Sequence, residues 1–198
     1  MMRRVLALAL LMFWPASASA QEWQLKPFLG LTFAGETTII DLDEAAGDVH
    51  SALGGSVSRI GEMLGFEADF GYVPGFLTGD REGRAVPSSS VLTLTGNVVI
   101  ALPRRMTQYT LRPYVAGGVG LMRVSKDDVF AVFPVTLNVV TIDVGGGATG
   151  FLSETVGLNW DIRYFRNITG SPDPANPGLS FGAPRLSFWR ITMGLVLR

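Results

Sequence analysis

The sequence of 198 residues predicts an all-β fold, a closed antiparallel eight-stranded up-and-down barrel that crosses a membrane. Three observations favour this fold. Apolar and polar residues alternate with a period of two in eight segments. The connections between these segments alternate between long and short, as they do in transmembrane β-barrels. The charged residues inside the seven clearest segments all lie on the polar face.

The first 20 residues have the order of a cleavable secretory signal peptide. The basic start Met1–Arg4 precedes the ten-residue apolar run Val5–Trp14, and the small residues Ala18-Ser19-Ala20 form a cleavage site. This run is too short to cross a bilayer as a helix. We therefore expect residues 1–20 to be removed and residues 21–198 to form one outer-membrane β-barrel domain.

The composition excludes several other classes of protein. The chain has 16 Lys and Arg residues, two of them in the signal peptide, against 17 Asp and Glu residues, so the exported part carries a net charge of −3. This slightly acidic balance argues against nucleic acid as a partner. The absence of cysteine excludes a disulfide scaffold, an Fe–S cluster, a thiol nucleophile and a cysteine-based zinc site.

The first four strands are expected at residues 24–33, 51–59, 64–72 and 91–102. In the first, three leucines, a proline and a phenylalanine share one face. The second has the weakest pattern, because two adjacent glycines and three serines blur it. In the third, Leu, Phe, Ala, Phe and Tyr alternate with Gly, Glu, Asp and Gly, and in the fourth, Leu, Val and Ile lie opposite Thr and Asn.

The last four strands are expected at residues 111–121, 139–150, 156–165 and 188–197. The fifth sets Leu, Pro and Val against Arg, Tyr and Gly, and the sixth sets Val, Ile and Ala against Thr, Asp and Gly. The seventh has the clearest alternation, with Val156, Leu158 and Trp160 on one face and Asn159 and Asp161 on the other. The eighth sets Trp, Ile, Met and Leu against Arg, Thr, Gly and Val.

The connections predict how the barrel sits in its membrane. The short ones are residues 60–63, 103–110 and 151–155, and the long ones are residues 34–50, 73–90, 122–138 and 166–187. The strands are about 9–11 residues long, the length that a tilted strand needs to cross a bilayer. We expect three short periplasmic turns and four long extracellular loops.

The charged residues predict which face of each strand meets lipid. Those on the polar face are expected to form a charge network in the lumen: Lys26, Glu67, Asp69, Arg112, Asp143, Asp161, Arg163 and Arg190. Arg123 and Arg166 have the apolar parity, and we expect them just past strand ends, where a long side chain reaches water. Five aromatic residues are expected to form girdles at the membrane interfaces: Trp23, Tyr72, Trp160, Tyr164 and Trp189.

A soluble closed barrel with its apolar face inward is the alternative, because both folds show the same alternation. Side-chain size distinguishes the two. A soluble barrel would carry long Lys, Glu and Gln side chains on its outside. In this chain the polar face holds mainly Gly, Thr, Asn and Ala with a few balanced charges, which suits a narrow lumen. The sequence therefore favours the membrane barrel.

Three stretches resemble the small eight-stranded outer-membrane β-barrel proteins of Gram-negative bacteria, the opacity-protein-like superfamily. They are LGFEADFGY at 64–72, RPYVAGGVG at 112–120, and VGGG at 144–147 running into VGLNWDIRYF at 156–165. The resemblance implies a monomer in the outer membrane whose partners are outer-membrane lipid, lipopolysaccharide and the barrel-insertion machinery. Chains of this family usually end in an aromatic residue that this machinery reads, whereas this sequence ends in Arg198.

Two motifs resemble ligand or catalytic sites but have a simpler interpretation. GGGATG at 145–150 fits a dinucleotide-binding pattern, but that site needs a following helix, and here a turn and a strand follow. Glu67 and Asp69 share a face about 6–7 Å apart, as in a paired-carboxylate hydrolase. The glycines are expected to pack the lumen, and the carboxylates to pair with lumenal arginines.

Two features of the first long connection also have alternatives. His50 is the only histidine and precedes Ser51, a pairing found in outer-rim hydrolases, but no acid fixes a triad. An acidic group could bind divalent cations that bridge to lipopolysaccharide, although its spacing does not match an EF-hand: Asp41, Asp43, Glu44 and Asp48. We expect a plain loop histidine and a solvated loop.

These observations predict a non-enzymatic integral outer-membrane protein with a plugged, charge-paired lumen. It would act through its exposed loops or in envelope integrity, and we expect no catalytic residue, cofactor or metal. One alternative is a small outer-membrane enzyme acting on lipid or peptide, of the deacylase or protease kind. The other is a narrow diffusion pore, which eight strands disfavour because side chains fill so small a barrel.

Overall fold

The computed structural model describes residues 22–37, 48–76, 89–103, 106–107, 111–126, 135–168 and 185–198. The predicted signal peptide lies outside these residues, and so do Asp41, Asp43 and Glu44 of the acidic group. Part of each predicted long connection is also outside them: residues 38–47, 77–88, 127–134 and 169–184. No helix in the described part of the chain has the length and apolar character needed to span a membrane.

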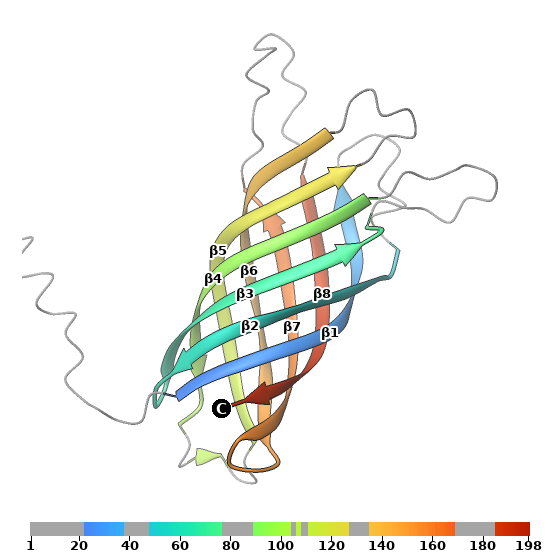
Figure 1. Ribbon diagram of the computed structural model, residues 1–198. Coiled ribbons are helices and arrows are strands. Elements are labelled where there is room, and N and C mark those ends of the chain that lie inside the picture. The colour runs from blue at the N-terminus through green and yellow to red at the C-terminus, as the bar shows by residue number, and fades with distance from the viewer. Residues whose placement is uncertain are drawn as a thin grey trace, which may run out of the picture.

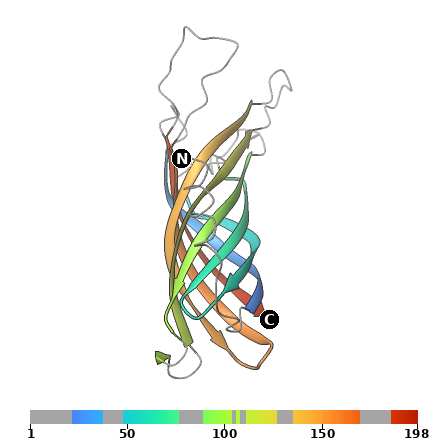
Figure 2. The same ribbon diagram turned by 90° about the vertical axis from the view of Figure 1, so that its left-hand side faces the viewer.

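Eight strands form one closed antiparallel barrel in which every strand pairs with its neighbours in the sequence and β8 closes on β1 (Figures 1 and 2). The predicted fold class is confirmed. The strands are β1 (Glu22–Thr37), β2 (His50–Ile60), β3 (Leu64–Pro74), β4 (Ser89–Ala101), β5 (Leu111–Lys126), β6 (Val135–Phe151), β7 (Val156–Asn167) and β8 (Leu186–Leu197).

The strands extend further toward the long connections than the alternation predicts. β1, β5 and β6 each gain several residues at that end. Arg123 and Arg166 therefore lie within β5 and β7, and the expectation that they fall past strand ends is wrong. The weakly patterned second strand is present and pairs with β1 and β3 along most of its length.

The strand register tilts every strand relative to the barrel axis. A row of paired residues runs Leu25, Val57, Ala68, Gly96, Val119, Ile142, Arg166, Ser187 and Glu36. One circuit thus returns to β1 eleven residues beyond its start, and one of these belongs to the bulge between Phe33 and Glu36. Each step to the next strand climbs by just over one residue, the stagger that closes a barrel of tilted strands.

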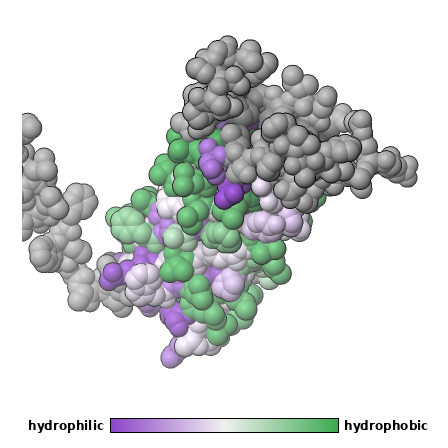
Figure 3. Space-filling view, turned by 45° about the horizontal axis from the view of Figure 1, so that its top comes forward, coloured by the Kyte–Doolittle hydropathy of each residue, from purple (hydrophilic) through white to green (hydrophobic). Residues whose placement is uncertain are grey.

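Large apolar side chains cover the outside of the barrel, where a soluble protein would be polar. Leu29 is 71% exposed, Phe66 is 72% exposed and Val119 is 59% exposed. Figure 3 shows apolar residues over much of the visible barrel wall. Because such a surface is stable only against hydrocarbon, this wall is the lipid-facing belt of a membrane barrel.

The pattern of the strands reverses at the end of the barrel that bears the long connections. In β5, Met122 and Val124 are buried inside while Arg123 is exposed outside. In β7, Phe165 is buried and Arg166 is exposed in the same way. The outer wall becomes polar where it leaves hydrocarbon, so this phase inversion marks the extracellular boundary of the apolar belt.

Candidate functional site

The interior of the barrel is the candidate site, because it gathers the charged residues that the sequence indicates. All eight predicted lumenal residues point inward and are at most 6% exposed. Seven of them lie together midway along the barrel. We call these seven the ionic layer: Lys26, Glu67, Asp69, Asp143, Asp161, Arg163 and Arg190.

Arg163 on β7 is the centre of the ionic layer. Its Nε donates to Asp161 Oδ1 at 2.7 Å, and its Nη2 donates to Glu67 Oε1 at 2.5 Å. Its Nη1 lies 3.6 Å from Asp143 Oδ2. The second oxygen of Glu67 accepts from Lys26 Nζ at 2.9 Å. One guanidinium thus joins carboxylates from β3, β6 and β7, which ties opposite walls of the barrel together.

Polar residues that the sequence did not single out complete this network. The Tyr114 hydroxyl donates to Asp161 Oδ2 at 2.7 Å, and Ser56 Oγ donates to Glu67 Oε2 at 3.2 Å. The Asn97 side-chain amide satisfies its hydrogen bonds in one of its two orientations. In that orientation its nitrogen donates to Asp143 Oδ1 at 2.8 Å and its oxygen accepts from Arg163 Nη1 at 2.6 Å. The sequence could have indicated these residues, since each lies on the polar, inward face of its strand.

Arg190 on β8 forms the second cluster of the ionic layer. Its Nη2 donates to both oxygens of Asp69, at 2.8 and 2.9 Å. Its guanidinium lies between the rings of Phe28 and Phe165, 4.7 Å from each centroid. A Cβ on Gly71 would lie 2.4 Å from Nη1, so only glycine leaves room for this arginine. The arginine is held by charge on one side and by aromatic faces on the others.

The ionic layer leaves almost no open space. The remaining cavity beside Lys26, Glu67 and Asp161 is about 10 Å³, at the lower limit for a single water molecule. The side chains therefore plug the middle of the barrel.

An apolar cap fills the extracellular half of the interior above the ionic layer. Its members are Ala52, Val73, Phe76, Val91, Met122, Val124, Val139, Phe165, Leu186 and Phe188. Phe165 and Phe188 stack with centroids 5.1 Å apart, and Phe76 lies 5.2 Å from Phe188. Phe76, Phe165 and Phe188 are at most 1% exposed. The lumen is thus closed by apolar packing as well as by charge.

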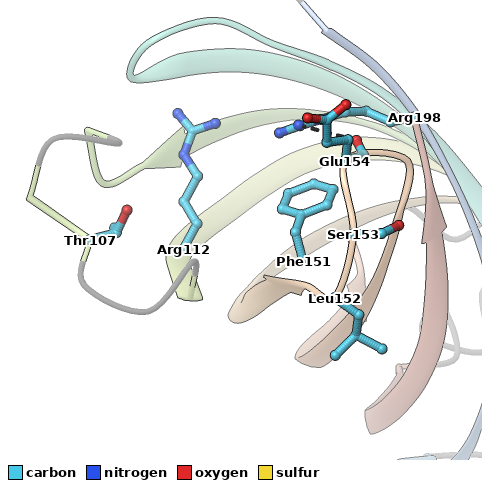
Figure 4. Close-up of a pocket in the computed structure, with 7 residues that line it drawn as sticks. All are labelled: Thr107, Arg112, Phe151, Leu152, Ser153, Glu154 and Arg198. Atoms are coloured by element: carbon cyan, nitrogen blue, oxygen red, sulfur yellow. Dashed lines mark hydrogen bonds between the residues drawn. The ribbon is translucent and has the colours of Figure 1, made fainter.

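Arg112 lies apart from the ionic layer, at the periplasmic mouth (Figure 4). It donates to the backbone carbonyls of Leu102, Gly61 and Glu62 at 2.7–2.9 Å, which fixes two short turns. A mouth cavity of about 520 Å³ lies between Arg112, the β6–β7 turn and Arg198.

Arg198 closes the other side of the mouth cavity. It forms an ion pair with Glu22 of β1 and stacks on Phe151 of β6, with its guanidinium carbon 4.0 Å from the ring centroid. These contacts join the two strands at the barrel seam to the β6–β7 turn.

The predicted girdle residues all lie on the outward parity. Trp23 begins β1 at the periplasmic end and is 63% exposed, with Arg59 over its ring. Tyr164 and Trp189 are register partners toward the extracellular end, with centroids 5.2 Å apart, and Tyr72 lies toward the same end of β3. Trp160 lies near the middle of β7.

The glycines of the dinucleotide-like motif and His50 lie in packed surroundings. Gly145 and Gly147 lie within β6, where a Cβ would come within 2.1 Å of a carbonyl oxygen on β7. His50 packs its ring 5.5 Å from Phe76, and its Nδ1 lies 3.0 Å from the Asp48 carbonyl oxygen. In the described ranges, no group of three His, Asp or Glu residues has the geometry of a metal site.

Comparisons with known proteins agree with this architecture. A family model for the outer membrane protein beta-barrel domain matches residues 6–184. A comparison with curated proteins finds no match. Neisserial surface protein A is 12% identical and has a TM-score of 0.62, covering 88% of this chain and 95% of that one.

Two barrels from Pseudomonas aeruginosa are also similar. OprG is 15% identical with a TM-score of 0.58, over 90% of this chain and 96% of that one. The N-terminal β-barrel domain of OprF is 13% identical with a TM-score of 0.52, over 89% and 97%. At these identities the likeness shows the fold alone.

Proposed function

The chain belongs to the outer membrane protein β-barrel family, and on that premise we propose that it is a plugged, non-enzymatic barrel that acts through its exposed loops or in envelope integrity. The outer-membrane location follows from the family and the fold. Within that setting, we propose that residues 21–198 form a monomer inserted by the general barrel machinery after residues 1–20 are removed.

The filled interior is the observation that supports this proposal. Ion pairs occupy the middle of the barrel, and phenylalanines occupy its extracellular half. A solute pore needs a continuous aqueous path, and the remaining cavity in the middle is about 10 Å³. A barrel that carries nothing through its centre instead contributes a rigid wall that holds its loops at the cell surface.

The described residues give no support to the enzymatic alternative. Glu67 and Asp69 are both held in ion pairs, with Lys26 and Arg163 and with Arg190. A hydrolytic carboxylate pair needs access to substrate and water, and both residues are at most 4% exposed. His50 contacts a phenylalanine ring and a backbone carbonyl, and neither group activates a nucleophile.

Conductance and lipid chemistry test the plugged, non-enzymatic barrel together. We expect the purified full-length mature protein to give no steady current in a planar bilayer. We also expect lipid A from cells that express it to have an unchanged mass, with His50→Ala cells as the comparison. Stable single-channel steps would replace the proposal with a pore. A deacylated lipid A that depends on His50 would replace it with an enzyme.

A loop-replacement experiment separates the two non-enzymatic roles. A variant with short turns in place of residues 38–47, 77–88, 127–134 and 169–184 keeps the eight strands and lacks these four segments. If the wall serves envelope integrity, this variant restores resistance to detergent in a deletion strain. If the loops carry the function, it folds, as judged by heat-dependent migration, but fails to restore the phenotype.

A further inference from the structure

Two arginines face outward where the phase inversion ends the apolar belt. Arg123 on β5 and Arg166 on β7 are both exposed on the lipid-facing side of the wall. In the described part of the chain, neither guanidinium has a hydrogen bond, an ion pair or a ring contact. A charge on this side of a strand is costly inside hydrocarbon, so both groups must lie at or beyond the membrane surface.

The residues beneath these arginines place them at the head groups. Tyr164 lies two residues before Arg166 on the same face and packs against Trp189, as interfacial aromatic residues do. Leu121, two residues before Arg123, is 58% exposed and belongs to the apolar belt. Each change from belt to guanidinium spans about 6–7 Å along the strand, so the charges lie directly above the acyl chains.

The stagger of the barrel brings both arginines to a similar depth. Arg123 pairs with Asn138 and Arg166 pairs with Ile142, so the two rows are four residues apart on β6. Each row of paired residues climbs by just over one residue per strand, so a row that passes from β5 to β7 rises by two to three residues. The remaining difference in depth between Arg123 and Arg166 is therefore only one to two residues. The arginines then differ in depth by roughly 4 Å, and their Cα atoms stand about 16 Å apart, because they are two strand spacings apart across the sheet and four residues apart along it.

We propose that Arg123 and Arg166 form a binding surface for the phosphates of lipopolysaccharide in the outer leaflet. Guanidinium groups bind phosphate through two parallel hydrogen bonds, and both groups are free to do so. Two such groups at one depth fit a single head group that carries two phosphates. Glu36, which follows Arg166 in the same row across Ser187, forms no ion pair with it.

Arg59 provides a matched control at the other end of the barrel. It is also exposed on the outward face, but it lies near the periplasmic boundary with its guanidinium over the ring of Trp23, at 5.7 Å from the centroid. It faces the inner leaflet, so its substitution changes the total charge equally without touching the proposed surface.

Binding of purified lipopolysaccharide to the folded, full-length mature barrel in detergent tests the proposal. We expect Arg123→Gln and Arg166→Gln each to weaken binding by about tenfold, the double variant to lose more than either, and Arg59→Gln to bind as the wild type does. Enzymatic removal of the lipid phosphates should weaken binding to the wild type and not to the double variant. Heat-dependent migration confirms that every variant is folded.

Three outcomes would overturn the proposal. One is a double variant that binds like the wild type, and another is wild-type binding that does not depend on the lipid phosphates. The third is equal competition by vesicles of phosphatidylglycerol, which would make the surface a general anion site. The proposal rests on the membrane orientation of the barrel and not on its plug. If the protein conducts ions while the arginine variants still lose binding, only the proposed function is refuted.

Discussion

The ionic layer and the apolar cap fill the same tube in two different ways. Both are built from side chains that point into the barrel, and both leave it closed. The ionic layer depends on defined pairs, since Arg163 alone serves three carboxylates. The apolar cap depends on volume, because its contacts are nondirectional. Similar changes in size should therefore be tolerated in the cap and not in the ionic layer.

The largest effect is expected when the centre of the ionic layer is removed. Arg163→Met keeps most of the side-chain volume but leaves Glu67, Asp161 and Asp143 without their shared cation, which should cost about 3–5 kcal/mol. Urea unfolding of the barrel in lipid vesicles measures this. Arg123→Met, the same exchange on the exposed outer wall, should change stability by no more than about 0.5 kcal/mol. A loss below about 1 kcal/mol for Arg163→Met would mean that water, not protein, satisfies these carboxylates.

A smaller effect is expected where the two regions meet. Gly71→Ala adds a Cβ that would lie 2.4 Å from Arg190 Nη1 and 2.8 Å from Thr93 Oγ1. The arginine must shift between its two rings, which should cost about 1–3 kcal/mol. Gly96→Ala is the control, because its added Cβ would meet only the Val119 carbonyl oxygen at 4.0 Å. Equal unfolding midpoints for the two variants would show that Arg190 is not tightly held.

The smallest effect is expected inside the apolar cap. Phe188→Leu keeps an apolar side chain in a cap of other apolar residues, and neighbours can repack around it at a cost below about 1.5 kcal/mol. The same unfolding measurement applies, with Arg163→Lys as the corresponding conservative change in the ionic layer. If Phe188→Leu destabilises the barrel as much as Arg163→Lys does, the distinction between the two regions fails.

The sequence predicts the wall of this barrel better than its contents. Alternation assigns Glu67 and Arg163 to the inside because parity alone decides the face of a strand. Parity carries no information on depth, so it could not separate Arg112 at the mouth from Arg163 in the ionic layer. That distinction depends on register, which hydrogen bonding between distant strands sets.

The missed strand ends have a related cause. The alternation predicts apolar residues outside and polar residues inside, and at Met122 and Arg123 this order reverses. A prediction that expects apolar residues only on the outer face therefore ends the strand where the apolar residues move to the inner face. Phe165 shows the same limit, since it was placed on the polar face without any indication that the interior there is apolar.

Apolar side chains separate the ionic layer from both ends of the barrel. The layer holds four carboxylates, Glu67, Asp69, Asp143 and Asp161, against three cations, because Arg112 is engaged at the mouth. Neutral hydrogen-bond donors make up part of the difference, since the hydroxyls of Tyr114 and Ser56 donate to Asp161 and Glu67. The apolar cap lies on the extracellular side of the layer, and a second buried apolar cluster lies on its periplasmic side: Ile60, Val99, Ala101, Tyr114 and Ala116. An ion from the periplasm or from outside the cell must therefore pass apolar packing before it reaches these charges, so added salt on either side of the membrane should screen the ion pairs only weakly.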